Sequence, residues 1–164
     1  MKTEYKIYIC DDHKLFLESI EVFIGLQPGY TCIGNAEDSV KALNEISLLK
    51  PDVVLIDYHL KENNGLDLLS SVREIHPNAA CFILTMRRDA AIRNSARSLG
   101  ARGYMLKSIG AEEMMTVFEL VLSDSIHFFD ALESEMIKTN RKIEEAVLSK
   151  RELEIAKMVC KELN

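Results

Sequence analysis

Short apolar runs alternate with longer amphipathic segments along residues 5–122. The clearest run is Val53-Val54-Leu55-Ile56, which follows Pro51 and ends at Asp57. An unbroken, mostly β-branched run of this length predicts a strand that is covered on both faces, as at the centre of a parallel sheet. Four similar runs predict further strands, at residues 6–10, 31–34, 80–84 and 103–106.

Each predicted strand is followed by apolar residues at helical spacing, and Asp38 or Ser39 is placed to cap the second of these helices. Gly65 or an asparagine beside it, in the polar loop before the third helix, is expected to adopt a positive φ. Five strands alternating with five helices predict an α/β doubly wound sheet of parallel strands. The predicted apolar helix faces are Phe16, Ile20 and Phe23; Val40, Leu43 and Ile46; Leu68, Leu69, Val72 and Ile75; Ile92, Ala96 and Leu99; and Met114, Phe118, Val121 and Leu122.

Four of the five predicted strands end in polar residues with possible chemical roles. Because parallel strands share their carboxyl ends, these residues should meet at one edge of the sheet, where ligands bind in folds of this class. Each residue alone has a simpler explanation, since an aspartate after a strand is often a turn or capping residue and a lysine is usually solvated. The residues are Asp11 and Asp12, Asp57, Thr85, and Lys107.

Three carboxylates at one edge repel one another unless a cation lies between them or one pKa is raised. Ligands that are all oxygen favour Mg²⁺. An aspartate beside Mg²⁺ can attack a phosphoryl group and form an aspartyl phosphate, while a hydroxyl and an ammonium hold the other phosphoryl oxygens. Thr85 and Lys107 have those two functional groups.

Composition narrows the possible partners. The 164 residues carry a net charge of −6, and residues 1–130 hold 19 acidic and 13 basic residues, whereas residues 131–164 hold seven of each. Strong nucleic-acid binding by the acidic part is therefore not expected. No apolar run approaches the roughly 18 residues of a membrane span, so we expect no membrane association and a cytoplasmic location. Four scattered cysteines suggest neither a zinc site nor a redox motif.

Several short motifs resemble the receiver domains of bacterial two-component response regulators. They are Asp11-Asp12-His13, Asp57 after the apolar run, Gly65, Leu84-Thr85-Met86 and residues 100–107 (GARGYMLK). The resemblance spans residues 5–122 and implies the flavodoxin-like strand order 2-1-3-4-5, which is the order known for such receivers.

The resemblance implies that Asp57 accepts a phosphoryl group from a sensor histidine kinase. It further implies that Asp12, Asp57 and the backbone carbonyl of His59 ligate Mg²⁺, with Asp11 holding the metal through water. The side chains of His13 and His59 are assigned no role at the metal.

In this family the threonine and the aromatic residue of the switch respond to phosphorylation. Thr85 would move toward the phosphoryl group and Tyr104 would swing inward, remodelling the face formed by helix four, strand five and helix five. Homodimerisation on phosphorylation is the expected result. Lys107 would remain bound to the phosphoryl group.

The last part of the chain resembles the start of a LuxR-type helix-turn-helix domain, as found in the NarL/FixJ subfamily. The likeness rests on residues 148–155 (LSKRELEI), in which Ser149 and Glu152 have capping-box spacing. We therefore predict a receiver domain at 1–124, a helical linker at 125–147 and the first helix of a DNA-binding domain at 148–164. Since a recognition helix does not follow, we expect DNA binding only from a longer protein.

Two other functions remain open at this stage. A Mg²⁺-dependent phosphatase could use an aspartyl phosphate, although such enzymes generally need a second acid where this chain has His59. A receiver-like interaction module that no longer accepts phosphate is the other alternative. A phosphorylation-controlled transcriptional regulator, whose catalysis is limited to its own phosphorylation and dephosphorylation, is the prediction that accounts for all the motifs.

Overall fold

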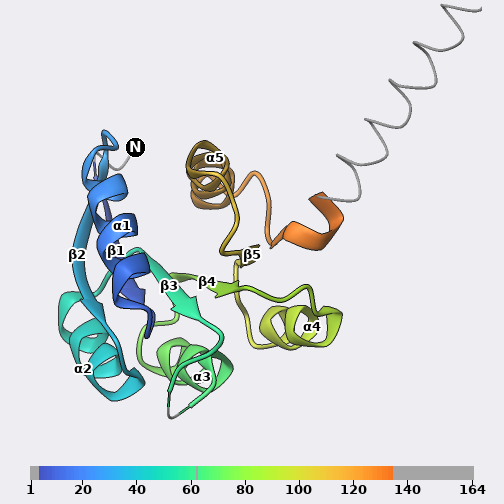
Figure 1. The fold of residues 1–164 in the computed structure, drawn as a ribbon, viewed down its shortest axis with the longest axis horizontal. Helices are drawn as coiled ribbons and strands as arrows, with labels where there is room; N and C mark the ends of the chain where they lie inside the picture. The colour runs from blue at the N-terminus through green and yellow to red at the C-terminus, as the bar shows by residue number, and fades with distance from the viewer. Residues whose placement is uncertain (1–3, 62, 135–164) are drawn as a thin grey trace, which may run out of the picture. The chain divides into compact units, whose positions relative to one another are not determined.

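A computed structural model describes residues 4–61 and 63–134, and within them the chain alternates strands and helices. All strand pairs are parallel, and the order across the sheet is β2-β1-β3-β4-β5-β6 (Figure 1). This confirms the flavodoxin-like order predicted for the first five strands. The elements are β1 (Tyr5–Cys10), α1 (Lys14–Gly25), β2 (Tyr30–Ala36), α2 (Ser39–Leu49), β3 (Val53–Asp57), α3 (Gly65–Ile75), β4 (Ala80–Thr85), α4 (Ala90–Ser98), β5 (Gly103–Leu106), α5 (Ala111–Leu122) and β6 (Phe129–Asp130).

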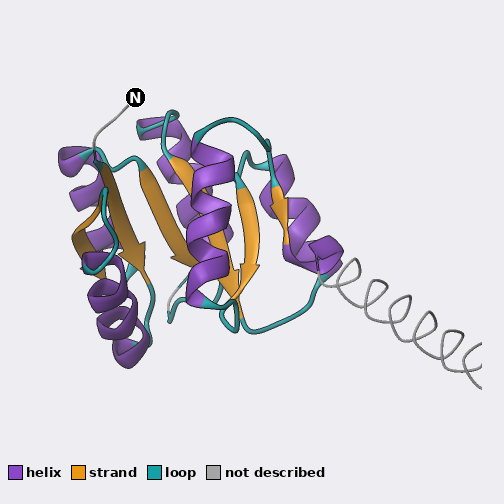
Figure 2. Cartoon of the chain, turned by 90° about the horizontal axis from the view of Figure 1, so that it is seen from above, coloured by secondary structure: helices purple, strands orange, loops and turns teal. Residues whose placement is uncertain are grey.

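The central strands are buried along their whole length, as the unbroken apolar runs predicted. Every residue of β3, β4 and β5 is buried. Because the strands run in one direction, as the arrows in Figure 2 show, their carboxyl ends lie at one edge. The register places Asp57 beside Leu84, and Thr85 beside Leu106.

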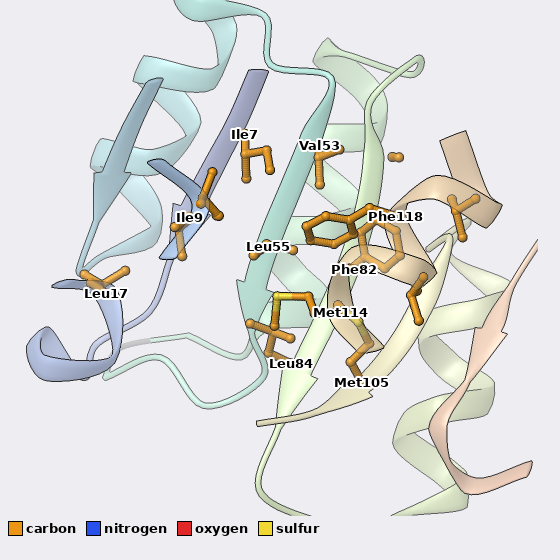
Figure 3. Packing of buried hydrophobic residues seen from close by; sticks show 14 residues of the cluster. Ile7, Ile9, Leu17, Val53, Leu55, Phe82, Leu84, Met105, Met114 and Phe118 are labelled. Atoms are coloured by element: carbon orange, nitrogen blue, oxygen red, sulfur yellow. The ribbon is translucent and has the colours of Figure 1, made fainter. Parts of the chain in front are cut away.

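Helices cover both faces of the sheet. Helices α1 and α5 pack on one face, where alternate strand residues such as Ile9, Leu55 and Phe82 join Phe118 in a single apolar cluster (Figure 3). Helices α2, α3 and α4 lie together on the other face (Figure 1). In the described part of the chain, none of the helices combines the length and apolar character needed to cross a bilayer.

Three details of the helices differ from the prediction. On α1 the most buried residues are Leu17 and Ile24, whereas the predicted Phe16, Ile20 and Phe23 flank them and are only partly buried. On α2, Ala42 and Ile46 are buried and Val40 is 65% exposed. A periodic pattern defines a helix face to within about one residue, and the neighbouring elements decide which residue of that face is buried. The predicted faces of α3, α4 and α5 include their observed buried residues except Gly65 and Val117. Two predicted residues, Ile75 and Leu99, are 37% and 38% exposed.

A sixth strand extends the predicted five-stranded sheet. Phe129 and Asp130 pair with Gly103 and Tyr104 of β5, although the prediction placed residues 125–147 in a helical linker. A two-residue strand has no periodicity that a sequence could reveal. The compact unit that contains the described sheet ends at Asp130. The rest of the predicted linker and the predicted helix-turn-helix segment lie outside the described residues, apart from residues 131–134.

Candidate functional site

The polar residues that follow β1, β3, β4 and β5 are positioned by backbone hydrogen bonds that continue the sheet. The Asp11 N–H donates to the Ala36 carbonyl at 3.0 Å, and the Lys107 N–H donates to the Thr85 carbonyl at 2.8 Å. The backbone therefore fixes the points from which these side chains extend, and the predicted convergence at one edge occurs.

Lys107 bridges two of the three carboxylates. Its Nζ lies 2.7 Å from Asp11 Oδ2 and 2.9 Å from Asp57 Oδ2. All three side chains are buried, with exposed fractions of 6% for Lys107, 0% for Asp11 and 2% for Asp57. The ring of Phe16 lies 4.9 Å from the same ammonium and shields it.

Asp57 is the carboxylate on which opposing influences meet. Burial raises its pKa, as does the nearby Asp11 carboxylate, whereas Lys107 and the backbone N–H of His59 lower it. Burial dominates, so the pKa of Asp57 is above its ordinary value. An added positive charge at this position would therefore favour the ionised, nucleophilic form.

The carboxylate oxygens are oriented toward a common point. Asp11 Oδ2, Asp12 Oδ1 and Asp57 Oδ2 are buried and accept no hydrogen bond of good geometry, although each has a cation or an imidazole within ion-pair distance. Buried oxygens without hydrogen-bond donors are costly unless a cation satisfies them. These residues thus fit a divalent cation, and Asp11, Asp12 and Asp57 are among the groups able to hold one.

His13 is a member of this cluster that sequence reasoning assigned no role. Its Nδ1 lies 2.8 Å from Asp12 Oδ1, 3.2 Å from Asp11 Oδ1 and 3.7 Å from Asp57 Oδ2. Because His13 directly follows Asp11 and Asp12, the sequence indicated that its side chain could reach the site. The direction of that side chain is set by the start of α1. His13 is the N-cap of that helix and makes no side-chain capping hydrogen bond.

The loop after β3 is held close to Asp57 by Gly65. A Cβ atom at this position would lie 2.2 Å from the Asp57 backbone oxygen, which is far inside van der Waals contact. The prediction of a positive φ near Gly65 was wrong, since neither Gly65 nor a described asparagine has one. Glycine is required here for close approach of α3 to the end of β3. His59 donates its backbone N–H to Asp57 Oδ1 at 3.3 Å and forms a bridge with Asn64.

On the other side of Asp57, Thr85 and Tyr104 are connected through the backbone of Arg87. The Arg87 N–H donates to Thr85 Oγ1 at 3.1 Å, and the Tyr104 hydroxyl donates to the Arg87 carbonyl at 2.5 Å. The Tyr104 oxygen also accepts from the Asp89 N–H at 3.1 Å. The Tyr104 ring is fully buried. The predicted inward swing of this ring on phosphorylation stays a prediction.

Comparison with known proteins gives a consistent result. The sequence profile of the family described as "Response regulator receiver domain" matches residues 7–119. The transcriptional regulatory protein YdfI of Bacillus subtilis is 28% identical over 96% of this chain and 76% of its own length. The transcriptional regulatory protein DegU of Brevibacillus brevis is 23% identical over 87% of this chain, which spans only 60% of that relative.

A solved structure supports the same grouping. A two-component response regulator of the LuxR family from Aurantimonas is 26% identical, with a TM-score of 0.74 over 84% of this chain and 98% of that one. The signal receiver domain of the putative regulator NarL from Mycobacterium tuberculosis is 28% identical, with a TM-score of 0.66 over 73% of this chain and 94% of that one.

Proposed function

The chain belongs to the response regulator receiver domain family, with relatives among LuxR-family regulators of two-component systems, and from this premise we propose that Asp57 is its phosphoacceptor. The observation that carries the proposal is the buried Asp57 carboxylate, with Lys107 Nζ at 2.9 Å and two further carboxylates beside it. Asp11 is equally buried and lies 2.7 Å from the same ammonium, but it follows the end of β1, whereas Asp57 is the last residue of the central strand β3.

The chemistry follows from those contacts. An Asp57 carboxylate oxygen forms a bond to phosphorus while the bond from phosphorus to the donor, a kinase histidine nitrogen or an acyl phosphate oxygen, breaks. Lys107 stabilises the negative charge on the phosphoryl oxygens. The ionised carboxylate needs no separate base, because it carries no proton to remove. Burial raises the pKa of Asp57, and Lys107 beside it lowers that pKa and favours the ionised form.

Mg²⁺ is the proposed cofactor. Asp12, Asp57 and the His59 backbone carbonyl would hold it directly, and Asp11 would hold it through water. The bound cation supplies charge neutralisation between the carboxylates and the incoming phosphoryl group. The assignment is supported by the three buried carboxylate oxygens, whose ligand atoms lie within 4.8 Å of one another and which share one ammonium between two of them.

Thr85 and Tyr104 are the proposed switch residues. Thr85 Oγ1 accepts from the Arg87 N–H, so a movement of the hydroxyl toward a phosphoryl group on Asp57 would stretch or break that hydrogen bond. Because the Arg87 carbonyl accepts from Tyr104, that rearrangement alters the loop between β4 and α4. A change of charge at Asp57 thus reaches the surface of α4 through neutral hydrogen bonds.

The partners and the setting are also proposals. A sensor histidine kinase would donate the phosphoryl group, the phosphorylated protein would form a homodimer, and a DNA-binding domain in a longer protein would contact the operator. The protein would act in the cytoplasm, and its catalysis would be confined to its own phosphorylation and dephosphorylation.

The test is intact mass spectrometry after incubation with acetyl phosphate and Mg²⁺. We expect the wild-type mass to rise by one phosphoryl group, and Asp57→Asn to show no increase. Asp67→Asn, which changes an exposed aspartate of α3, is the matched control and should be phosphorylated like the wild type. Uptake by Asp57→Asn would place the acceptor elsewhere, and no uptake by the wild type would favour an interaction module without phosphorylation.

A further inference from the structure

The His13 imidazole lies among the carboxylates proposed to bind Mg²⁺. Its Nδ1 is within 3.7 Å of an oxygen from each of Asp11, Asp12 and Asp57. Together, the four side chains offer ligand atoms that all lie within 4.8 Å of one another. The ring is 64% exposed, so it reaches the site from the solvent side while the aspartates are held from the protein side.

These separations suit a common coordination shell. Ligand atoms about 2.1 Å from one octahedral cation are roughly 3.0 Å apart when adjacent and 4.2 Å apart when opposite. The distances from Nδ1 to the oxygens of the two directly ligating aspartates, 2.8 Å to Asp12 Oδ1 and 3.7 Å to Asp57 Oδ2, are close to or within this range. With its proton on Nε2, the ring presents the Nδ1 lone pair as a nitrogen donor.

Within residues 4–61 and 63–134, the other soft or nitrogen donors near the aspartates are not free to bind a metal. Cys10 is the last residue of β1, but its thiol is engaged with the Asp38 carbonyl, which lies 3.7 Å from Sγ. The Lys107 ammonium is occupied by Asp11 and Asp57. The His59 ring packs edge-on against Tyr58, with 4.7 Å between ring centroids. His13 is thus the one candidate nitrogen ligand among these neighbours.

A nitrogen donor changes which cation a site prefers. Mg²⁺ binds oxygen ligands almost exclusively, whereas imidazole suits Mn²⁺ moderately and Ni²⁺ or Zn²⁺ strongly. An imidazole in the shell should leave Mg²⁺ affinity nearly unchanged and raise the affinity for transition metals.

We propose that His13 is a direct ligand of the cation at this site and that it shifts the metal preference of the receiver toward Mn²⁺ and Ni²⁺. This rests on the proposed function only in taking the aspartates as a metal site. Its consequence is a site able to use a transition metal when Mg²⁺ is scarce. The competing possibility is that the ring occupies the place of the cation and is displaced when a metal binds.

The test compares metal affinities without phosphorylation. Isothermal titration at pH 8 with Mg²⁺ and with Ni²⁺ is carried out on the wild type, His13→Ala and His13→Asn. Both variants should lower the ratio of Ni²⁺ to Mg²⁺ affinity by about tenfold or more, since even the loss of an outer-shell group that only supports a ligand costs about tenfold in metal affinity. Mg²⁺ affinity itself should change by less than about threefold. His127→Ala, which removes an exposed histidine after α5, should leave the ratio unchanged.

A second readout detects the bond itself. Pulsed electron paramagnetic resonance of bound Mn²⁺ should show coupling to an imidazole nitrogen in the wild type and in His127→Ala, but not in His13→Ala. An unchanged affinity ratio with no nitrogen coupling would overturn the proposal, and a rise in Mg²⁺ affinity in His13→Ala would show that the ring is displaced. If Asp12→Asn and the wild type bind Mg²⁺ equally, the metal site of the proposed function has failed instead.

Discussion

The two sides of Asp57 are built from different interactions. On the β1 side, which we call the carboxylate side, Asp11, Asp12 and His13 meet Lys107 in a cluster of charged or ionisable groups. On the β4 and β5 side, which we call the hydroxyl side, Thr85 and Tyr104 are joined by neutral hydrogen bonds through the Arg87 backbone. One sheet edge thus combines a charged region with an uncharged region.

The difference explains how such a site can both accept and report a phosphoryl group. Charged groups in a buried site respond strongly to added charge, because the low dielectric magnifies each Coulomb interaction. Neutral hydrogen bonds respond mainly by exchanging partners, at a net cost of about 1 kcal/mol each. The carboxylate side is therefore suited to bind the phosphoryl group, and the hydroxyl side is suited to rearrange in response.

Removing the Lys107 ammonium from the carboxylate side should have the largest effect on stability. We expect Lys107→Met to lower the free energy of unfolding at pH 7 by about 3–5 kcal/mol, because it leaves Asp11 and Asp57 buried without their shared partner. Mg²⁺ at a concentration of about 100 times its Kd should restore about 2–3 kcal/mol of the free energy of unfolding, if it binds only the folded state. Urea denaturation with and without Mg²⁺ measures both changes. Lys14→Met, whose ammonium is 75% exposed, should change stability by less than about 0.5 kcal/mol.

The same variant should show a defined pH dependence. Burial raises the pKa of Asp57 and Lys107 lowers it, so removing Lys107 raises the pKa further. A raised folded-state pKa gives stability that is fully present below the unfolded value of about 3.9 and is lost as pH rises through the folded pKa. The difference from the wild type should therefore be small near pH 4 and grow toward pH 7. An equal difference at both pH values would show that lost packing, and not charge, causes the effect.

The close approach at Gly65 should be the next most sensitive feature. Gly65→Ala forces a Cβ atom toward the Asp57 carbonyl oxygen, which is 2.2 Å away in the present backbone, and should destabilise the protein by about 3 kcal/mol. Gly25→Ala at the end of α1 is the control, because no atom lies within 4 Å of its added Cβ. That control should be neutral or stabilising by up to about 1 kcal/mol. Thermal unfolding measures the stability of both variants, and equal losses of stability would contradict the argument.

The residues of the carboxylate side could be predicted from the sequence, but the orientation of their side chains could not. Asp11, Asp57, Thr85 and Lys107 follow strands that unbroken apolar runs define, and parallel topology alone brings strand ends together. The direction of the His13 ring depends on how α1 begins, which no periodicity specifies. Gly65 was identified, but for a positive φ instead of a close approach, because crowding by Asp57 is visible only in three dimensions.

The hydroxyl side was less accessible for a related reason. The connection between Thr85 and Tyr104 uses backbone groups of Arg87, and every residue except proline has both a backbone donor and a backbone acceptor. The strand β6 has only two residues and exists because β5 offers an edge for pairing. Both features depend on tertiary contacts, whereas the first five strands can be predicted mainly from the local pattern of apolar residues.

A substitution on the hydroxyl side should lower the free energy of unfolding by a smaller amount, and that amount should not depend on pH. Tyr104→Phe removes a hydroxyl that bonds Arg87 and Asp89, and should cost about 1–2 kcal/mol at every pH from 5 to 8. Tyr8→Phe is a matched control, since it removes the hydroxyl of a buried tyrosine in β1 that donates to Glu45 of α2. Both variants should accept phosphate, but only Tyr104→Phe should alter phosphorylation-induced dimerisation, measured by sedimentation. Equal dimerisation in all three proteins would remove Tyr104 from the switch.

The smallest predicted effect tests whether charge also contributes on the hydroxyl side. Arg93 of α4 places Nη1 2.9 Å from Asp130 Oδ2 of β6, next to Tyr104 in the sheet, and Asp130 is 5% exposed. Because Arg93 is partly solvated, a double-mutant cycle of Arg93→Met and Asp130→Asn should give a coupling energy of about 1 kcal/mol. The coupling should fall in 1 M salt, where the Debye length is about 3 Å. A coupling above about 3 kcal/mol would mean that the hydroxyl side depends on charge as strongly as the carboxylate side does, and the proposed division between them would not hold.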